Sequence, residues 1–166
     1  MTSQWPPREV LTLRQRLDAL SDLVEKPSHY EVPQDALEWL ARLLVVRSCG
    51  YLEQAILEVL RAYISARSGG PPRTFAHSWL ERGSNPTPDA LALLAGRFDT
   101  TWSNELIDLL EADDQRLHRE VSFLVDRRNR IAHGLNEGIG SVKALALKGV
   151  ACELADWFVL RFNPAR

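Results

Sequence analysis

The sequence predicts an all-α domain, and three observations indicate that fold class. Apolar residues recur at intervals of three and four along most of the chain, which is the period of a helix with one buried face. The alternating pattern of a half-buried β-strand is nearly absent. Proline- and glycine-containing segments at residues 27–33, 68–72, 83–86 and 138–140 divide the chain into helix-sized lengths. The 166 residues suit one domain, taken here as residues 1–166.

The first two expected helices lie at residues 7–26 and 34–67, joined by a linker at residues 30–33. The first carries a single apolar stripe, formed by Val10, Leu13, Leu17, Leu20 and Val24. The stripe of the second is wider, which is typical of a helix that packs against neighbours on more than one side. Gly50 lies in the middle of this helix, where glycine is unfavourable, and it indicates a kink or the close approach of another helix.

Residues 68–112 are expected to form an insert of short helices between the second and third long helices. Thr87 precedes Pro88 and Asp89, and this order is typical of an N-cap followed by the first turn of a helix. A further short helix is expected to open at residues 99–101. The insert therefore adds short helices to one side of a bundle of longer ones.

The third long helix is expected to begin at Asp113 and Asp114, because the N-terminus of a helix favours acidic side chains. It runs to about His133, and Gly134 is the expected C-terminal stop. The last helix covers residues 141–162. These elements predict a helical bundle of four to five main helices with short inserted helices.

Composition and charge exclude several classes of protein. A formal net charge of −2 does not suit a purely electrostatic nucleic-acid binder, so any contact with RNA must come from a local patch. No apolar run is long enough to span a membrane, and residues 1–7 lack the apolar stretch of a secretory signal. Cys49 and Cys152 lie among apolar residues and are expected to be reduced core residues. We therefore expect a cytoplasmic protein.

No metal or cofactor site is expected. Histidines are few and scattered, and they lack the spacing that zinc ligands require. The sequence contains no phosphate-binding loop, no dinucleotide-binding glycine motif and no nucleophile elbow. Any chemistry must therefore come from the side chains themselves.

The end of the third long helix is the segment that indicates chemistry. On a helical projection one stripe is formed by Leu117, Val121, Leu124, Arg128 and Ile131. A permanent cation in the middle of an apolar face needs a partner or a cleft, because an unpaired buried charge is costly. Arg128 can be a structural arginine whose stem packs on the core. It can also line a phosphate site, since its planar guanidinium binds two oxygens at once.

His133 follows Arg128 by five residues, which is about 140° around an ideal helix. The two side chains would therefore not share a face of a regular helix, whereas Asn129 and His133 would. Two routes bring Arg128 and His133 together: the helix unwinds near Gly134, or the residues converge across a symmetric dimer. A histidine at a helix C-terminus is also a common cap or dipole partner, so geometry alone leaves its role open.

The run Arg128-Asn129-Arg130-Ile131-Ala132-His133 matches the R-(x)4–6-H motif of HEPN domains, with a polar residue directly after the arginine. The upstream stretch LARLLVVRSCGYLEQAILEVLRAY is similar to the second-helix pattern of the RiboL-PSP-HEPN branch. The resemblance covers about residues 37–162. It implies a four- to five-helix domain that forms a homodimer, in which two such motifs meet in one composite cleft.

The resemblance also implies an activity, a metal-independent endoribonuclease of toxin–antitoxin, phage-defence or RNA-processing systems, with RNA as substrate and an antitoxin or regulatory protein as a further partner. Arg128 and His133 would be catalytic and Asn129 would support them. The basic bias of the same helix makes Arg119, Arg127 and Arg130 candidates for RNA binding, or equally for a solvated helix face.

The alternative is a non-catalytic helical module that dimerises or binds a protein, since some HEPN domains have lost activity. Retention of both motif residues favours the nuclease, and the slightly acidic net charge favours the module.

Overall fold

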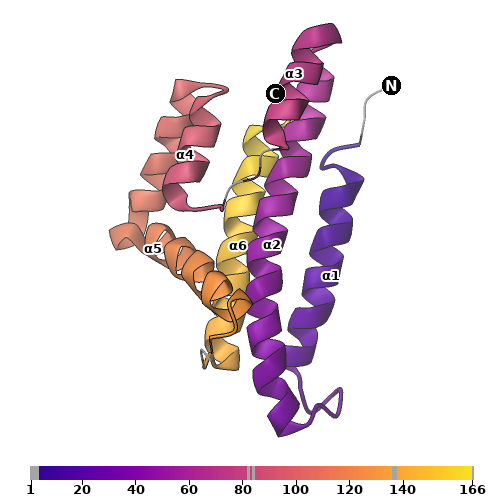
Figure 1. Cartoon of the computed structure of the whole chain (residues 1–166), viewed down its shortest axis with the longest axis vertical. Helices are drawn as coiled ribbons and strands as arrows, with labels where there is room; N and C mark the ends of the chain where they lie inside the picture. The colour runs from indigo at the N-terminus through magenta and orange to yellow at the C-terminus, as the bar shows by residue number, and fades with distance from the viewer. Residues whose placement is uncertain (1–3, 82, 84, 136–137, 166) are drawn as a thin grey trace.

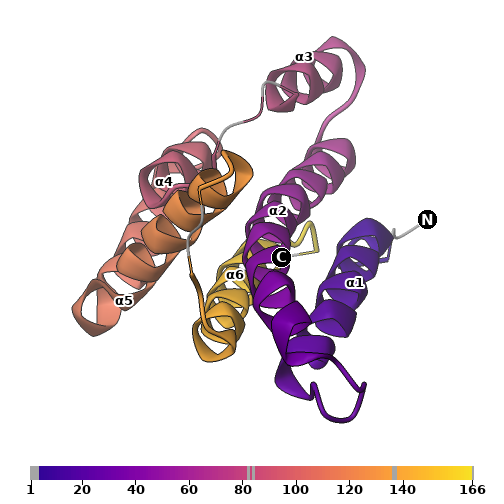
Figure 2. The same ribbon diagram turned by 60° about the horizontal axis from the view of Figure 1, so that its bottom comes forward.

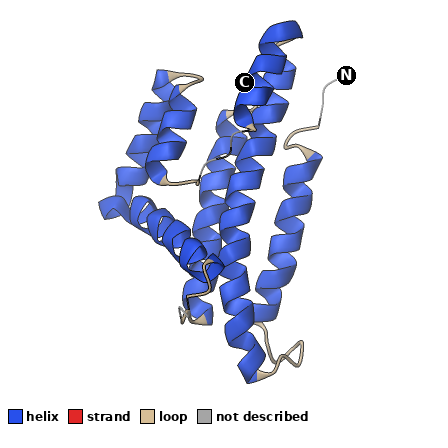
Figure 3. Ribbon diagram, in the orientation of Figure 1, coloured by secondary structure: helices blue, strands red, loops and turns tan. Residues whose placement is uncertain are grey.

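The computed structural model of the chain describes residues 4–81, 83, 85–135 and 138–165. Throughout these residues the regular secondary structure is helical (Figure 3). The helices are α1 (Arg8–Glu25), α2 (Gln34–Arg67), α3 (Gly70–Leu80), α4 (Pro88–Gly96), α5 (Thr100–Ala132) and α6 (Ser141–Arg161). The predicted all-α fold, with short helices between the longer ones, is confirmed.

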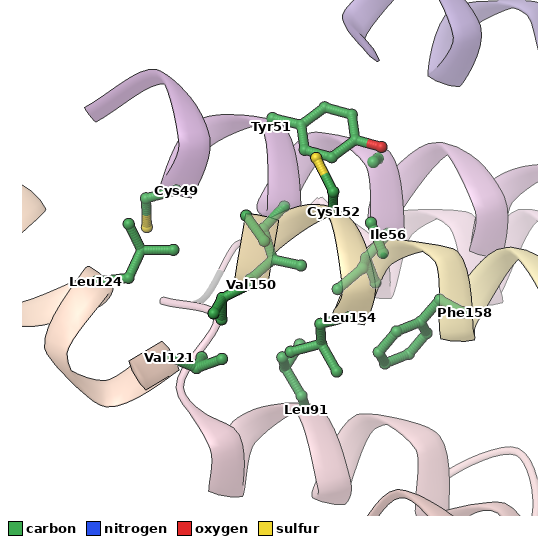
Figure 4. Packing of buried hydrophobic residues seen from close by; sticks show 14 of the residues in the cluster. Cys49, Tyr51, Ile56, Leu91, Val121, Leu124, Val150, Cys152, Leu154 and Phe158 are labelled. Atoms are coloured by element: carbon green, nitrogen blue, oxygen red, sulfur yellow. The ribbon is translucent and has the colours of Figure 1, made fainter. Parts of the chain in front are cut away.

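Three helices form the centre of the molecule. α1, α2 and α6 lie side by side, and the C-terminal half of α5 crosses obliquely against α2 and α6 (Figures 1 and 2). α2 buries side chains on several sides, as its wide apolar stripe predicts. α6 also packs on several neighbours through its buried residues, and its Leu154 and Phe158 point into the core beside Ile56 of α2 (Figure 4).

Both cysteines are buried and reduced, as expected. Cys49 points from α2 toward Leu124 of α5, and Cys152 of α6 lies next to the ring of Tyr51 (Figure 4). Burial is the largest influence on both thiols and raises the pKa of each. Each cysteine therefore behaves as a small neutral core residue at neutral pH.

An aromatic cluster joins the C-terminal ends of α2 and α6 to the inserted helices. Phe162 directly follows α6, is fully buried, and has four aromatic neighbours. Its ring centroid lies 5.4 Å from that of Tyr63, 5.1 Å from Phe98, 4.8 Å from Trp102 and 5.6 Å from Phe158. These rings belong to α2, the α4–α5 corner, the start of α5 and α6, so one side chain connects four parts of the fold.

The inserted helices extend from the bundle in two directions. α3 packs against the end of α2, and α4 pairs with the first half of α5 (Figure 1). Thr87 caps α4 as predicted, because its side-chain oxygen accepts a hydrogen bond from the backbone N–H of Ala90 at 3.3 Å. Asp99 caps α5 in the same way through the N–H of Thr101 at 2.7 Å.

α5 changes direction at residues 112–115, and the predicted helix start at Asp113 and Asp114 is wrong. Asp113, Asp114 and Gln115 have φ values of 51°, 56° and 58°, so they form a left-handed turn rather than the first turn of a helix. Right-handed helix resumes at Arg116. Aspartate tolerates left-handed backbone better than most residues, which explains why this joint carries two of them. Asp114 still faces the new helix start, and its carboxylate pairs with Arg119 at 3.1 Å.

Gly50 marks neither a kink nor a close approach. α2 is continuous from Gln34 to Arg67, and a Cβ added at Gly50 would have no heavy atom within 4 Å outside its own helix backbone. We expect Gly50→Ala to stabilise the folded monomer by about 1 kcal/mol, since alanine restricts the unfolded chain and suits a helix interior. Urea denaturation at low protein concentration measures this change, and a loss of stability would contradict the open surroundings of Gly50.

Candidate active site at the end of helix α5

The C-terminal half of α5 presents an apolar face to the core, and Arg128 lies on it as predicted. Leu117, Val121 and Leu124 on this face are at most 2% exposed. Arg128 follows Leu124 by one turn and is half-buried. The cation therefore lies where the apolar face of α5 ends against α2 and the segment before α4.

Two side chains from distant parts of the sequence contact Arg128. Its Nη2 donates a hydrogen bond to Oδ1 of Asn85 at 2.6 Å, and its guanidinium also interacts with the thiol of Cys49 on α2. The positive charge and hydrogen bond of Arg128 lower the pKa of that thiol, but burial outweighs them and the net shift is upward. The thiol is therefore neutral at pH 7 and does not neutralise the arginine.

Arg128 has no acidic partner within the described residues. No carboxylate there lies within ion-pair distance of its guanidinium, and its buried Nε has no hydrogen-bond partner among them. A half-buried guanidinium without a counter-charge is unfavourable unless an anion binds it. This is the electrostatic environment that a phosphate oxygen would complete.

His133 occupies the C-cap of α5 and is exposed. The next residue, Gly134, has a φ of +75° and closes a Schellman motif, as its predicted role as helix stop requires. In this motif the N–H of Leu135 donates to the carbonyl of Arg130 and the N–H of Gly134 to that of Ile131, each at 3.0 Å. The backbone on both sides of His133 is thereby fixed while its imidazole remains open to solvent.

The structure does not bring Arg128 and His133 together within one chain. α5 remains helical through Ala132, so the two side chains stay about 140° apart around its axis. Unwinding near Gly134, one of the two routes considered from the sequence, is therefore not what the fold uses, since the chain turns only after His133. Asn129 and His133 share the solvent-facing side of α5.

The candidate RNA-binding arginines have different surroundings. The guanidinium of Arg127 lies over the ring of Phe123, 4.7 Å from its centroid. Arg130 pairs with Asp126 at 3.2 Å, and Arg119 pairs with Asp114 as described above. Arg119 and Arg130 are both exposed on the face that carries His133. Their role in RNA binding stays a prediction.

Sequence reasoning missed Asn85 and the proximity of Cys49 to Arg128. Asn85 lies in the insert, 43 positions before Arg128, and nothing in its local pattern distinguishes it from an ordinary turn residue. Cys49 was expected only to fill the core. Both contacts arise from tertiary packing, which periodicity cannot reveal.

The motif and its helix lie in a region that matches a known protein family. The model of the RiboL-PSP-HEPN family matches residues 11–159, which include the complete helices α2, α3, α4 and α5 and most of α1 and α6. The chain belongs to the RiboL-PSP-HEPN family. Comparison with curated proteins and with solved structures gives no match. The R-(x)4–6-H motif of this HEPN domain thus lies at the end of α5, inside the matched region.

The described residues of this HEPN domain also bear on membrane insertion and metal binding. None of its described helices is long and apolar enough to cross a membrane. In the same part of the chain, histidine, cysteine and acidic side chains do not gather in groups of three or more that suit a metal ion.

Gly134 is expected to be sensitive to substitution because its φ is positive. Gly134→Ala places a Cβ in a left-handed conformation that costs about 1–2 kcal/mol, although the space around it is open. We expect the free energy of unfolding to fall by about 1 kcal/mol, which thermal or urea denaturation measures. Gly138→Ala is the matched control, since Gly138 has equally open space and no positive φ. Equal losses in the two variants would contradict the Schellman motif as the cause.

Proposed function

We propose that this HEPN domain is a metal-independent endoribonuclease. The observation that carries the proposal is a half-buried guanidinium at Arg128 without an acidic partner among the described residues, five residues before an exposed histidine at the end of the same helix. The family supports it, because many HEPN domains cut RNA. Arg128 would bind a phosphate of the RNA, and His133 would transfer protons.

The proposed reaction uses the RNA as its own nucleophile. The 2′-oxygen attacks the adjacent phosphorus and forms a new O–P bond, while the bond from phosphorus to the 5′-oxygen breaks. One imidazole accepts the proton of the 2′-hydroxyl and a protonated imidazole donates one to the 5′-oxygen. The products are a 2′,3′-cyclic phosphate and a 5′-hydroxyl. Arg128 would stabilise the negative charge that develops on the phosphoryl oxygens, and Asn129 would orient His133 or a phosphate oxygen.

A second copy of the chain would complete this site, since one chain keeps Arg128 and His133 on different sides of α5. Exposed apolar side chains at this end of the bundle support a self-association surface. They come from the start of α2, the segment after α5 and the start of α6: Trp39, Leu43, Leu135 and Val142 are 68%, 46%, 54% and 85% exposed. Large exposed apolar side chains grouped in this way are typical of protein interfaces.

RNA cleavage in excess chelator tests the proposed function. We expect the wild type to cut, and both Arg128→Ala and His133→Ala to lose about 10²–10⁴-fold in rate, the usual contribution of such groups. The controls are Arg116→Ala and His118→Ala, which remove the same residue types from α5 outside the site. Circular dichroism shows whether each variant is folded. A wild type that leaves a broad RNA panel intact would instead favour the non-catalytic interaction module.

A further inference from the structure

A cavity of about 270 Å³ lies between α2, α3 and α4. Most of its wall is apolar, with contributions from Ile56, Leu57, Leu60, Leu80, Leu91 and Leu94. The motif residues of α5, Arg128 to His133, do not line it. Cavities of this kind, apolar with a few polar groups, are the usual form of small-molecule and base-binding sites.

One carboxylate interrupts the apolar wall. Glu53 of α2 is half-buried and lines the cavity one turn before Leu57. Within the part of the chain that the structure describes, Glu53 has neither an ion pair nor a hydrogen bond. An ionised carboxylate is only an acceptor of hydrogen bonds, so a ligand that fits here must offer N–H or O–H donors to it.

The cavity adjoins the environment of Arg128 on two sides. Pro86 is buried in the cavity wall and directly follows Asn85, which accepts the hydrogen bond from Arg128. On α2, Glu53 follows Cys49 by one helical turn, and both Glu53 and Arg128 influence the pKa of the Cys49 thiol. A ligand held at Glu53 is therefore a near neighbour of any phosphate held at Arg128.

A cation also lines the cavity. The guanidinium of Arg97 lies over the ring of Trp79 at 4.2 Å from its centroid, and both residues line the cavity. Arg97 is exposed, so it can meet a second phosphate without loss of its stacking contact. The cavity thus combines apolar walls, a carboxylate acceptor near Arg128 and an exposed cation.

We propose that this cavity binds a guanine base of the RNA substrate, with Glu53 as the specificity-determining residue. Guanine presents two adjacent N–H donors on its Watson–Crick edge, from N1 and the 2-amino group, and a carboxylate can accept both. Adenine and cytosine place an acceptor beside their amino group, and uracil flanks its single N–H with two carbonyls. The apolar side chains would cover the faces of the base, as in other single-stranded RNA sites. This inference rests on the proposed ribonuclease function and names its preferred substrate.

Binding of mononucleotides tests the inference without any need for cleavage. Isothermal titration calorimetry of the wild-type protein with GMP, AMP, CMP and UMP is expected to show tightest binding of GMP. Glu53→Gln keeps the shape but loses the second acceptor oxygen and the charge, and it should weaken GMP binding by about 10- to 100-fold. Glu58→Gln is the control, because Glu58 lies on the same helix outside the cavity and pairs with Arg61 at 2.8 Å. Ala90→Trp, which fills the cavity, should abolish GMP binding in a folded protein.

The outcomes separate this inference from the proposed function. Equal binding of all four nucleotides, or GMP binding that Glu53→Gln leaves unchanged, overturns the guanine site. RNA cleavage without preference for guanine overturns it as well, while the ribonuclease function stands. If GMP binding depends on Glu53 but the protein cuts no RNA, the guanine site is supported and the proposed ribonuclease function is contradicted. An apolar dye that binds the wild type but not Ala90→Trp reports on occupancy of the cavity. Competition between this dye and GMP would place the nucleotide in the cavity.

Discussion

A dimer with one wild-type and one His133→Ala protomer is expected to lose RNA cleavage by about 10²–10⁴-fold, as far as the His133→Ala homodimer does. The reason is that one motif histidine per chain supplies two per dimer, and the proposed reaction needs both a proton acceptor and a proton donor. In one chain His133 is exposed and lies about 140° around the axis of α5 from Arg128. In the proposed mechanism, a second protomer would supply the missing proton-transfer group.

Co-expression of two differently tagged chains, followed by two affinity steps, isolates the mixed dimer for this measurement. A mixed dimer of wild type and His118→Ala is the control, because His118 lies on α5 near Asp89 and outside the motif. Half of the wild-type rate in the His133 mixed dimer would indicate two independent sites. Full activity would contradict a mechanism that uses two histidines. A purely monomeric protein in light scattering would contradict the proposal of a composite site.

Phe162→Ala is expected to lower the free energy of unfolding by about 3–5 kcal/mol, the usual cost of removing a buried aromatic ring. Phe162 is fully buried and its ring contacts aromatic rings from α2, the α4–α5 corner, the start of α5 and α6. Truncation leaves a cavity where these parts meet. Since small domains are stable by only about 5–15 kcal/mol, this loss is a large fraction of the total.

Urea denaturation followed by far-UV circular dichroism measures the effect. Phe162→Leu should cost less, roughly 1–1.5 kcal/mol, because it keeps much of the buried volume. Phe75→Ala is the surface control: Phe75 is 73% exposed on α3, and its loss should change stability by at most about 0.5 kcal/mol. Similar losses for Phe162→Ala and Phe75→Ala would contradict the central place of Phe162 in the core.

The fold class and most helix positions could be predicted from sequence because they depend on local signals. The period of the apolar residues located α1, α2 and α6, and the N-cap at Thr87 and the stop at Gly134 have local chemical causes that the structure bears out. The predicted start of the second half of α5 was wrong because acidic residues suit both a helix N-terminus and a left-handed turn. Local sequence does not choose between these two, whereas the packing of α4 against α5 does.

The candidate site was predictable only in part for a similar reason. The position of Arg128 on an apolar stripe follows from spacing, and so does its angular separation from His133. Its contacts with Asn85 and Cys49 depend on how the insert folds back on α2, and no spacing rule gives that. The same holds for the cavity beside Glu53, whose walls come from three helices.

The central position of α6 has a consequence for folding during synthesis, because helices leave the ribosome in chain order. α6 packs against both α1 and α2, yet it is the last of the six helices to be synthesised. Until then α2 has no cover for much of its apolar surface, and the aromatic cluster lacks Phe162. Helices α1 to α5 alone therefore cannot complete the core, and the nascent chain must stay protected from aggregation until α6 emerges. Folding of this HEPN domain is thus coupled to synthesis of the segment that forms α6.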